Sequence, residues 1–61
     1  MAHVKVSDRI LDGEGRIDGI MQSAGYYPDS YLYLMDGCPV PSDTEISGED
    51  MVEAIRVASG G

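Results

Sequence analysis

The two glycines at the end of the chain, Gly60 and Gly61, have the clearest chemical potential. An end without side chains can enter a narrow channel, and its backbone reaches conformations that are closed to other residues. The only reactive group that it presents is the α-carboxylate. We therefore predict that another protein acts on this end of the chain. The alternative is an ordinary frayed terminus, because glycine-rich ends are common.

Segment 12–18 has three acids and two glycines in the spacing of the middle of a helix–loop–helix calcium loop. That register places Ile10 and Met21 at the first and last positions of the loop, where calcium needs carboxylate ligands. Neither side chain can bind a hard cation, and calcium affinity depends on the number of ligands. We therefore expect no metal site here, only an acidic turn exposed to solvent.

His3 and Cys38 are the other side chains with potential for catalysis or metal binding. A zinc site needs about four ligands, and these two residues are too few. Cys38 as a nucleophile would need a nearby base in a shaped pocket, which so small a chain can hardly build. We expect Cys38 to be a small residue in a hairpin and His3 to be solvated on the polar face of a strand.

The composition excludes several classes of protein. The chain has 61 residues, 43% of them hydrophobic, with one cysteine and a net charge of −7. Nucleic acids and anionic membranes both require clustered lysine and arginine, so neither is an expected partner. A single cysteine cannot form an internal disulfide, and no apolar stretch is long enough to span a bilayer. We expect a monomeric cytoplasmic domain, not an enzyme. Its acidity is consistent with a solvated surface, with attraction to a basic partner, or with adaptation to high salt inside the cell.

The first half of the chain predicts two strands and a helix. Alternation of apolar and polar residues predicts a strand over residues 2–7, and a second, short strand followed by a loop lies within 8–16. Apolar residues at helical spacing predict a short helix over 17–24, with Gly25 as its C-terminal cap. The residues of this helical stripe are Ile17, Ile20, Met21 and Ala24.

The second half predicts a hairpin and a final strand. Residues 31–35 form the strongest strand, and the dipeptide Asp36-Gly37 that follows favours a tight turn. The return strand over 38–41 contains two prolines, which places it at an edge of the sheet. Ile46 is expected to anchor the next loop in the core, and 51–57 is a central strand. One helix on a small sheet of four or five strands makes the fold class α+β.

The order of these features resembles the C-terminal half of the β-grasp, ubiquitin-like modifiers and sulfur carriers. It is closest to the small archaeal modifier proteins, and it is more distantly similar to the thiamine-biosynthesis sulfur carrier and the molybdopterin-synthase small subunit. The resemblance implies a β-grasp domain over 1–57 and a flexible tail over 58–61. The features that carry it are the strand and turn Leu32–Gly37, the Pro-Val-Pro of 39–41, the loop with Ile46, the strand Val52–Val57 and the terminal Ser59-Gly60-Gly61.

The resemblance further implies a protein that is a substrate of an E1-like activating enzyme. That enzyme would use Mg-ATP to adenylate the carboxylate of Gly61. The adenylate would then become a thiocarboxylate through a sulfur-transfer enzyme, or an isopeptide with a lysine of a target protein. Protein tagging and sulfur delivery to tRNA, thiamine or molybdopterin remain open. Lys5 is the only lysine of the chain, so self-conjugation would use Lys5 or the α-amino group. The alternative is a passive acidic interaction domain.

Strand alternation also predicts a binding surface. The register that buries Tyr33 leaves Leu32 and Leu34 on the other face of the sheet, and the final strand places Ile55 and Val57 there too. Exposed aliphatic patches on small domains usually mark binding surfaces, and related families dock on their activating enzymes through this face. We therefore expect Leu34, Ile55 and Val57 to contact the partner. With a register shifted by one residue, the same side chains would be core.

Overall fold

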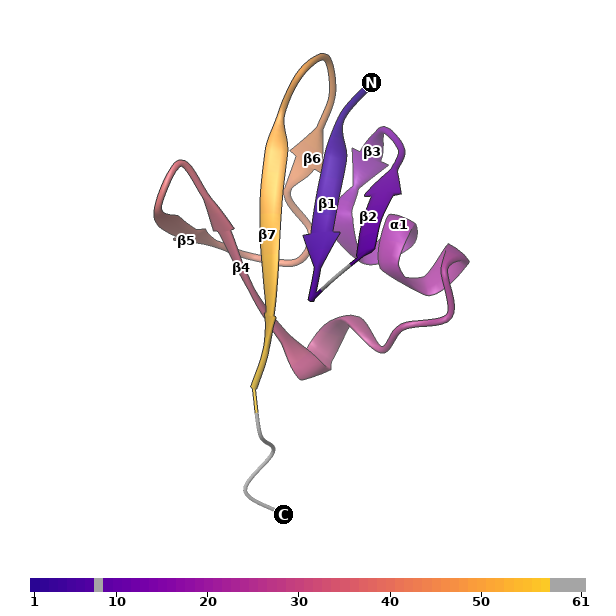
Figure 1. Cartoon of the computed structure of the whole chain (residues 1–61), viewed down its shortest axis with the longest axis vertical. Coiled ribbons are helices and arrows are strands. Elements are labelled where there is room, and N and C mark those ends of the chain that lie inside the picture. Colours follow the sequence, from indigo (N-terminus) through magenta and orange to yellow (C-terminus); the bar gives the residue numbers. More distant parts are fainter. Residues whose placement is uncertain (8, 58–61) are drawn as a thin grey trace.

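The computed structural model describes residues 1–7 and 9–57, so the predicted tail over 58–61 lies outside the described residues. Within these described residues, nine short elements follow one another (Figure 1). In order they are β1 (His3–Val6), β2 (Arg9–Asp12), β3 (Gly15–Arg16), α1 (Ile17–Ser23), the 3₁₀ turn η1 (Pro28–Ser30), β4 (Tyr31–Met35), β5 (Cys38–Val40), β6 (Glu45–Ile46) and β7 (Met51–Arg56).

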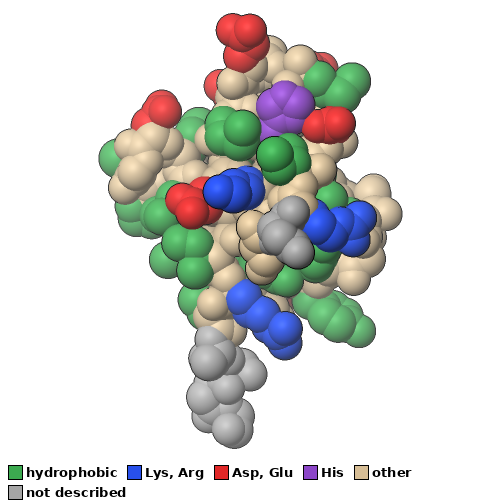
Figure 2. Space-filling model, in the orientation of Figure 1, with side chains coloured by type: hydrophobic (Ala, Val, Ile, Leu, Met, Phe, Trp, Pro, Cys, Tyr) green, Lys and Arg blue, Asp and Glu red, His purple; other side chains and the backbone are tan. Residues whose placement is uncertain are grey.

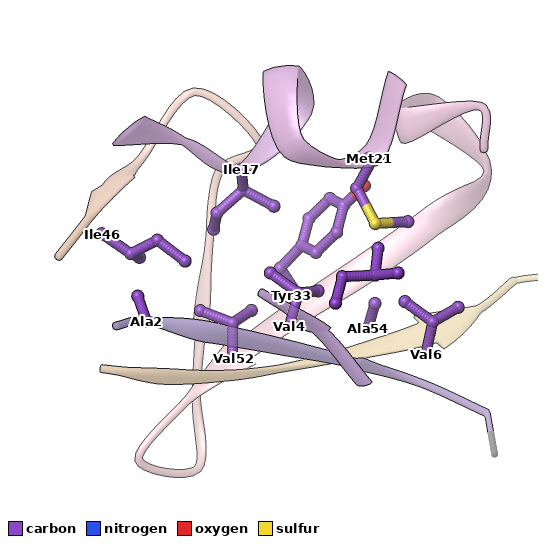
Figure 3. Packing of buried hydrophobic residues seen from close by; sticks show 10 residues of the cluster. Ala2, Val4, Val6, Ile17, Met21, Tyr33, Ile46, Val52 and Ala54 are labelled. Atoms are coloured by element: carbon purple, nitrogen blue, oxygen red, sulfur yellow. The ribbon is translucent and has the colours of Figure 1, made fainter. Parts of the chain in front are cut away.

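Five of the strands form one mixed sheet in the order β2-β1-β7-β4-β5. The first strand, β1, runs parallel to the last, β7, and the other neighbours are antiparallel. The helix α1 packs on one face of this sheet, as Figures 1 and 3 show. The α+β prediction of one helix on a small mixed sheet is therefore confirmed, and the final strand is central as predicted.

The core lies between α1 and the sheet. Valines from β1 and β7 point toward the helix, and Ile17 and Met21 point back toward the sheet (Figure 3). Two members of the predicted helical stripe, Ile17 and Met21, are fully buried, while Ile20 and Ala24 pack against the rim of the cluster. The buried hydrophobic residues are Ala2, Val4, Val6, Leu11, Ile17, Met21, Tyr33, Ile46, Val52 and Ala54.

The turns follow from the residues predicted to make them. Asp36 and Gly37 both have positive φ, 53° and 80°, which gives the β4–β5 hairpin the twist that the strands require. Gly25 has φ 89° directly after the C-cap of α1, as expected of a left-handed helix end. The edge strand β5 contains Pro39, in agreement with the expected edge position.

The loops contain structure that the sequence patterns did not predict. β3 and β6 form a separate two-stranded sheet that pairs Gly15 with Ile46. Next to it, the amide N–H of Ile17 donates to the carbonyl oxygen of Thr44 at 3.0 Å. These bonds hold the start of α1 to the long loop, so Ile46 is buried as expected. A two-residue strand is too short to show periodicity, which is why both were missed.

In the described part of the chain, no helix is long and apolar enough to cross a membrane. The helix α1 has seven residues.

Candidate functional site

The end of the central strand β7 is the place where the predicted site begins. β1 pairs with β7 only as far as Ala54, so Ile55 and Arg56 extend past the end of β1 along β4. The last described backbone contact of the chain is made by Val57, whose N–H donates to the carbonyl oxygen of Ser30 at 3.0 Å. The predicted reactive residues, Gly60 and Gly61, lie outside the described residues.

An apolar patch lies on the sheet face opposite α1, and we define it as Leu32, Leu34, Ile55 and Val57. Leu32, Ile55 and Val57 are 46%, 41% and 42% exposed, high values for large aliphatic side chains. Figure 2 shows hydrophobic side chains gathered over β4, β5 and the lower part of β7. The structure thus places all three predicted partner contacts on one face.

Leu34 is the least exposed of these predicted contacts. It is half-buried, and it lies between Glu53 on β7 and Pro39 on β5. Leu32 is more exposed than Leu34 and lies directly opposite Ile55, so it belongs to the centre of the apolar patch. Sequence alternation placed Leu32 on this face. Its greater exposure follows from its position two residue pairs closer to the end of β4, where β5 no longer pairs with the strand.

Lys5, the expected site of self-conjugation, is exposed on the same outer face of the sheet. It lies on β1 opposite Glu53 of β7 and Ile10 of β2. A small hollow of about 210 Å³ separates Lys5 from Ile55 and Arg56. The amine is therefore accessible to a reacting carboxylate from another copy of the chain.

A cluster of aromatic and basic side chains lies near the C-terminal end of β7, where Arg56 pairs with Tyr31. The rings of Tyr26 and Tyr31 meet edge to face, with centroids 5.9 Å apart and planes at 88°. The guanidinium of Arg9 lies over Tyr26, 5.9 Å from its centroid, and Arg56 is opposite Tyr31. Tyr33 is the one fully buried tyrosine, as its strand register predicts, whereas Tyr27 is 80% exposed.

The acids of the turn over 12–18 contact separate partners. The carboxylate of Asp12 lies 2.6 Å from Nδ1 of His3, and that of Asp18 accepts from Arg16 at 2.8 Å. Glu14 accepts from the amide N–H of Gly48 at 3.3 Å. The three acids thus point to three different partners. Within residues 1–7 and 9–57, no group of three or more His, Cys, Asp and Glu side chains could hold a metal ion.

His3 and Cys38 lie apart from each other and differ in surroundings. His3 was expected to be only solvated, but its ring is held by Asp12 across the β1–β2 pair. Cys38 is a free, exposed thiol on the edge strand β5, at the opposite end of the sheet order from β2. The fold therefore does not bring these two residues together as a nucleophile and its base.

A titratable group with a shifted pKa, Tyr33, lies in the core and not in the apolar patch. Burial of the Tyr33 ring, with smaller effects from Asp18 and Asp29, raises the pKa of its hydroxyl to about 12. That hydroxyl donates to the carbonyl oxygen of Pro28 at 2.7 Å. The neutral form is the donor, so this tyrosine has a structural role in holding η1 against β4.

Comparison with models of known protein families and with curated proteins found no match for this chain.

Proposed function

We propose that this chain is a β-grasp protein of the ubiquitin-like kind, a protein modifier or sulfur carrier whose Gly61 carboxylate is activated by an E1-like enzyme. The observation that carries the proposal is the position of β7. It is the central strand, it runs parallel to β1, it extends past β1 beside the apolar patch, and it is the last strand before the diglycine in the sequence. A β-grasp domain has this arrangement, with the helix on the other face of the sheet.

The chemistry needs an external enzyme because a carboxylate is a poor electrophile. An oxygen of the Gly61 carboxylate attacks the α-phosphorus of Mg-ATP, pyrophosphate leaves, and an acyl adenylate forms. A hydrosulfide equivalent then displaces AMP to give a thiocarboxylate, or a lysine amine displaces AMP to give an isopeptide. The ATP and Mg²⁺ belong to the enzyme, and this chain supplies only the carboxylate and the surface that presents it.

The apolar patch would dock on the activating enzyme. Leu34, Ile55 and Val57 are the proposed contacts, and exposed Leu32 extends the same surface. Docking here would direct the residues after Val57 toward the ATP site. Eleven acids against four bases would speed the encounter with a basic enzyme surface.

A passive acidic interaction domain is the second candidate. The observation that favours it is that the apolar patch is complete without Gly60 and Gly61, because Leu32, Leu34, Ile55 and Val57 all precede them. Such a domain would bind a partner and leave its carboxylate unchanged.

The deciding experiment is the intact mass of the protein after incubation with an E1-like enzyme, ATP and Mg²⁺. A gain of one AMP, or the replacement of one oxygen by sulfur when a sulfur donor is added, is the expected result. A matched control lacks ATP, and a second one uses the chain shortened by Gly60-Gly61. The enzyme must first be shown to activate its own modifier. An unchanged mass in all three reactions with that enzyme then favours the passive domain.

A further inference from the structure

A hollow lined by three tyrosines and an arginine lies at the C-terminal end of β7, and we call it the tyrosine hollow. Tyr31 of β4 is opposite Arg56 of β7 and lies two residues from buried Tyr33. Side chains two residues apart on a strand share a face, so Tyr31 and Arg56 lie on the helix side of the sheet and the apolar patch lies on the other. The hollow has a volume of about 290 Å³, and its lining residues are Gly25, Tyr26, Tyr27, Ser30, Tyr31 and Arg56.

The aromatic wall of the tyrosine hollow combines fixed rings with an exposed one. Tyr26 and Tyr31 meet edge to face, and both pack against the core cluster, which holds their rings in place. Tyr27 is 80% exposed. An exposed ring beside two fixed rings is a surface on which a planar ligand can stack, because stacking removes aromatic area from water.

Three groups that can donate hydrogen bonds also line the tyrosine hollow. The hydroxyl oxygen of Tyr26 accepts from Arg9 at 3.3 Å, so its own hydrogen is left for an acceptor. Within residues 1–7 and 9–57, the Arg56 guanidinium and the Ser30 hydroxyl make no side-chain hydrogen bond and no ion pair. Three donors at one small site favour a ligand rich in acceptors.

Charge at this end favours an anion, although the chain as a whole is acidic. Arg9 and Arg56 are two of the four bases of the chain, and they flank the pair Tyr26 and Tyr31. None of the described lining residues is acidic, and the exposed Asp29 of η1 is not among them. On the face shown in Figure 2, blue side chains reach the lower end of the molecule, whereas red ones lie in its upper and middle parts.

The size of the tyrosine hollow and its donors together define the ligand. A volume of about 290 Å³ is at the lower limit of small-molecule pockets, about 300–1,000 Å³, so it suits one ring with one charged group. A guanidinium binds phosphate through two parallel hydrogen bonds. A phosphate ester has three acceptor oxygens and a charge of about −1.5 to −2 at pH 7, which matches three donors better than a carboxylate does.

We propose that the tyrosine hollow binds the phosphate ester of a single aromatic ring. The ring stacks on Tyr27, and the phosphate accepts hydrogen bonds from Arg56, Ser30 and the hydroxyl of Tyr26. This chemistry occurs in free aryl phosphates and in the phosphotyrosine side chains of proteins. The site uses neither the Gly61 carboxylate nor the apolar patch, so it goes beyond the proposed function and does not depend on it.

NMR titration of the isotope-labelled full chain with phenyl phosphate tests the site. The expected result is saturable shifts of the amides of Tyr26, Tyr27 and Arg56 at millimolar concentrations of the probe. Benzyl alcohol supplies a ring without charge, and inorganic phosphate supplies the charge without a ring. Each of these two control probes should bind at least about fivefold more weakly than phenyl phosphate, because each lacks half of the contacts.

A phosphotyrosine blocked at both ends distinguishes the two sources of the ligand. Its binding should shift the same amides. Tighter binding than that of phenyl phosphate would support a protein side chain as the ligand, because the backbone groups of the blocked residue add contacts. Equal or weaker binding would support a free aryl phosphate.

Three variants locate the site. Arg56→Gln removes a guanidinium at an exposed position and should weaken phenyl phosphate binding at least about tenfold. Lys5→Gln is its matched control and should bind as the parent does, because Lys5 has the same charge on the neighbouring strand but does not line the tyrosine hollow. Tyr27→Ala should weaken phenyl phosphate binding at least about threefold and leave inorganic phosphate binding unchanged, because only the stacking is lost.

Three results would overturn the proposal. The first is the absence of amide shifts with phenyl phosphate. The second is equal affinity for phenyl phosphate and either control probe, which would show that ring and phosphate are not recognised together. The third is an equal loss in Arg56→Gln and Lys5→Gln, which would show attraction to the overall charge only. If Arg56→Gln does not fold, Tyr27→Ala and the control probes on the parent chain still decide.

Discussion

Leu32 of β4 and Ile55 of β7 lie directly opposite each other on the open face of the sheet, and both are more than two-fifths exposed. Cross-strand aliphatic pairs stabilise a sheet, but a pair this exposed leaves much apolar surface in water. The pair lies where β7 extends past β1, two residues before Val57. This is the relationship on which the proposed docking surface depends.

Ile55→Ser should weaken activation by the E1-like enzyme at least about tenfold, because buried aliphatic contacts at an interface contribute 1 kcal/mol or more. The melting temperature should change little, since Ile55 is exposed. Met51→Ser is the matched control, because Met51 is on the same strand and face, is 48% exposed and lies at the far end of β7. Rates of adenylate formation and thermal melts check both variants. An equal loss of activation in the two variants would contradict a localised surface.

Removal of Gly60-Gly61 should abolish adenylation and leave the thermal stability unchanged. Every buried hydrophobic residue of the described chain is at or before Ala54, so the shortened chain keeps all of them. Mass spectrometry of the reaction and a thermal melt provide the two measurements. Formation of an adenylate on the shortened chain would exclude Gly61 as the reactive residue.

The fold was predictable where side-chain periodicity and turn chemistry agree. The alternation of Val4 and Val6 and the helical spacing of Ile17 and Met21 identified buried faces that the structure confirms. The Asp36-Gly37 turn was equally clear, because few residues adopt positive φ. At each of these positions, the local sequence pattern and the packing of the core favour the same residue types.

The features that the sequence did not reveal depend on partners distant along the chain. The pairing of β3 with β6 joins Gly15 to Ile46, and the contact of Arg9 with Tyr26 joins β2 to the turn after α1. Neither has a local pattern. The edge position of β2 was missed for the same reason, because it follows from the strand order and not from its four residues. The apolar patch was predicted from alternation, but the relative exposure of Leu32 and Leu34 was not.

Tyr33 should make the stability fall at high pH. Its pKa is raised from 10.0 to about 12 in the folded state, so the unfolded state loses its proton first. The stabilising effect is complete below pH 10 and is lost as the pH rises toward 12. Tyr33→Phe should flatten this part of the pH dependence, and at neutral pH it should cost about 1 kcal/mol, because the hydrogen bond to Pro28 is lost. Urea unfolding at several pH values measures both effects, and Tyr27→Phe, at an 80% exposed position, is the control. Parallel pH curves for the parent and Tyr33→Phe would contradict the assignment.

A pair of glycine substitutions should have opposite effects on stability. Gly19 is inside α1, and a Cβ there would meet no atom within 4 Å. Gly19→Ala should therefore stabilise the protein by about 0.5–1 kcal/mol, because alanine has less conformational freedom than glycine in the unfolded chain. Gly25 also has open space around it, but its φ is 89°, so Gly25→Ala should destabilise the protein by about 1 kcal/mol. Because neither methyl group clashes, the difference isolates backbone conformation from packing. Urea unfolding of the two variants measures it. A loss of stability in Gly19→Ala as large as that in Gly25→Ala would show that α1 does not have a helical backbone at Gly19.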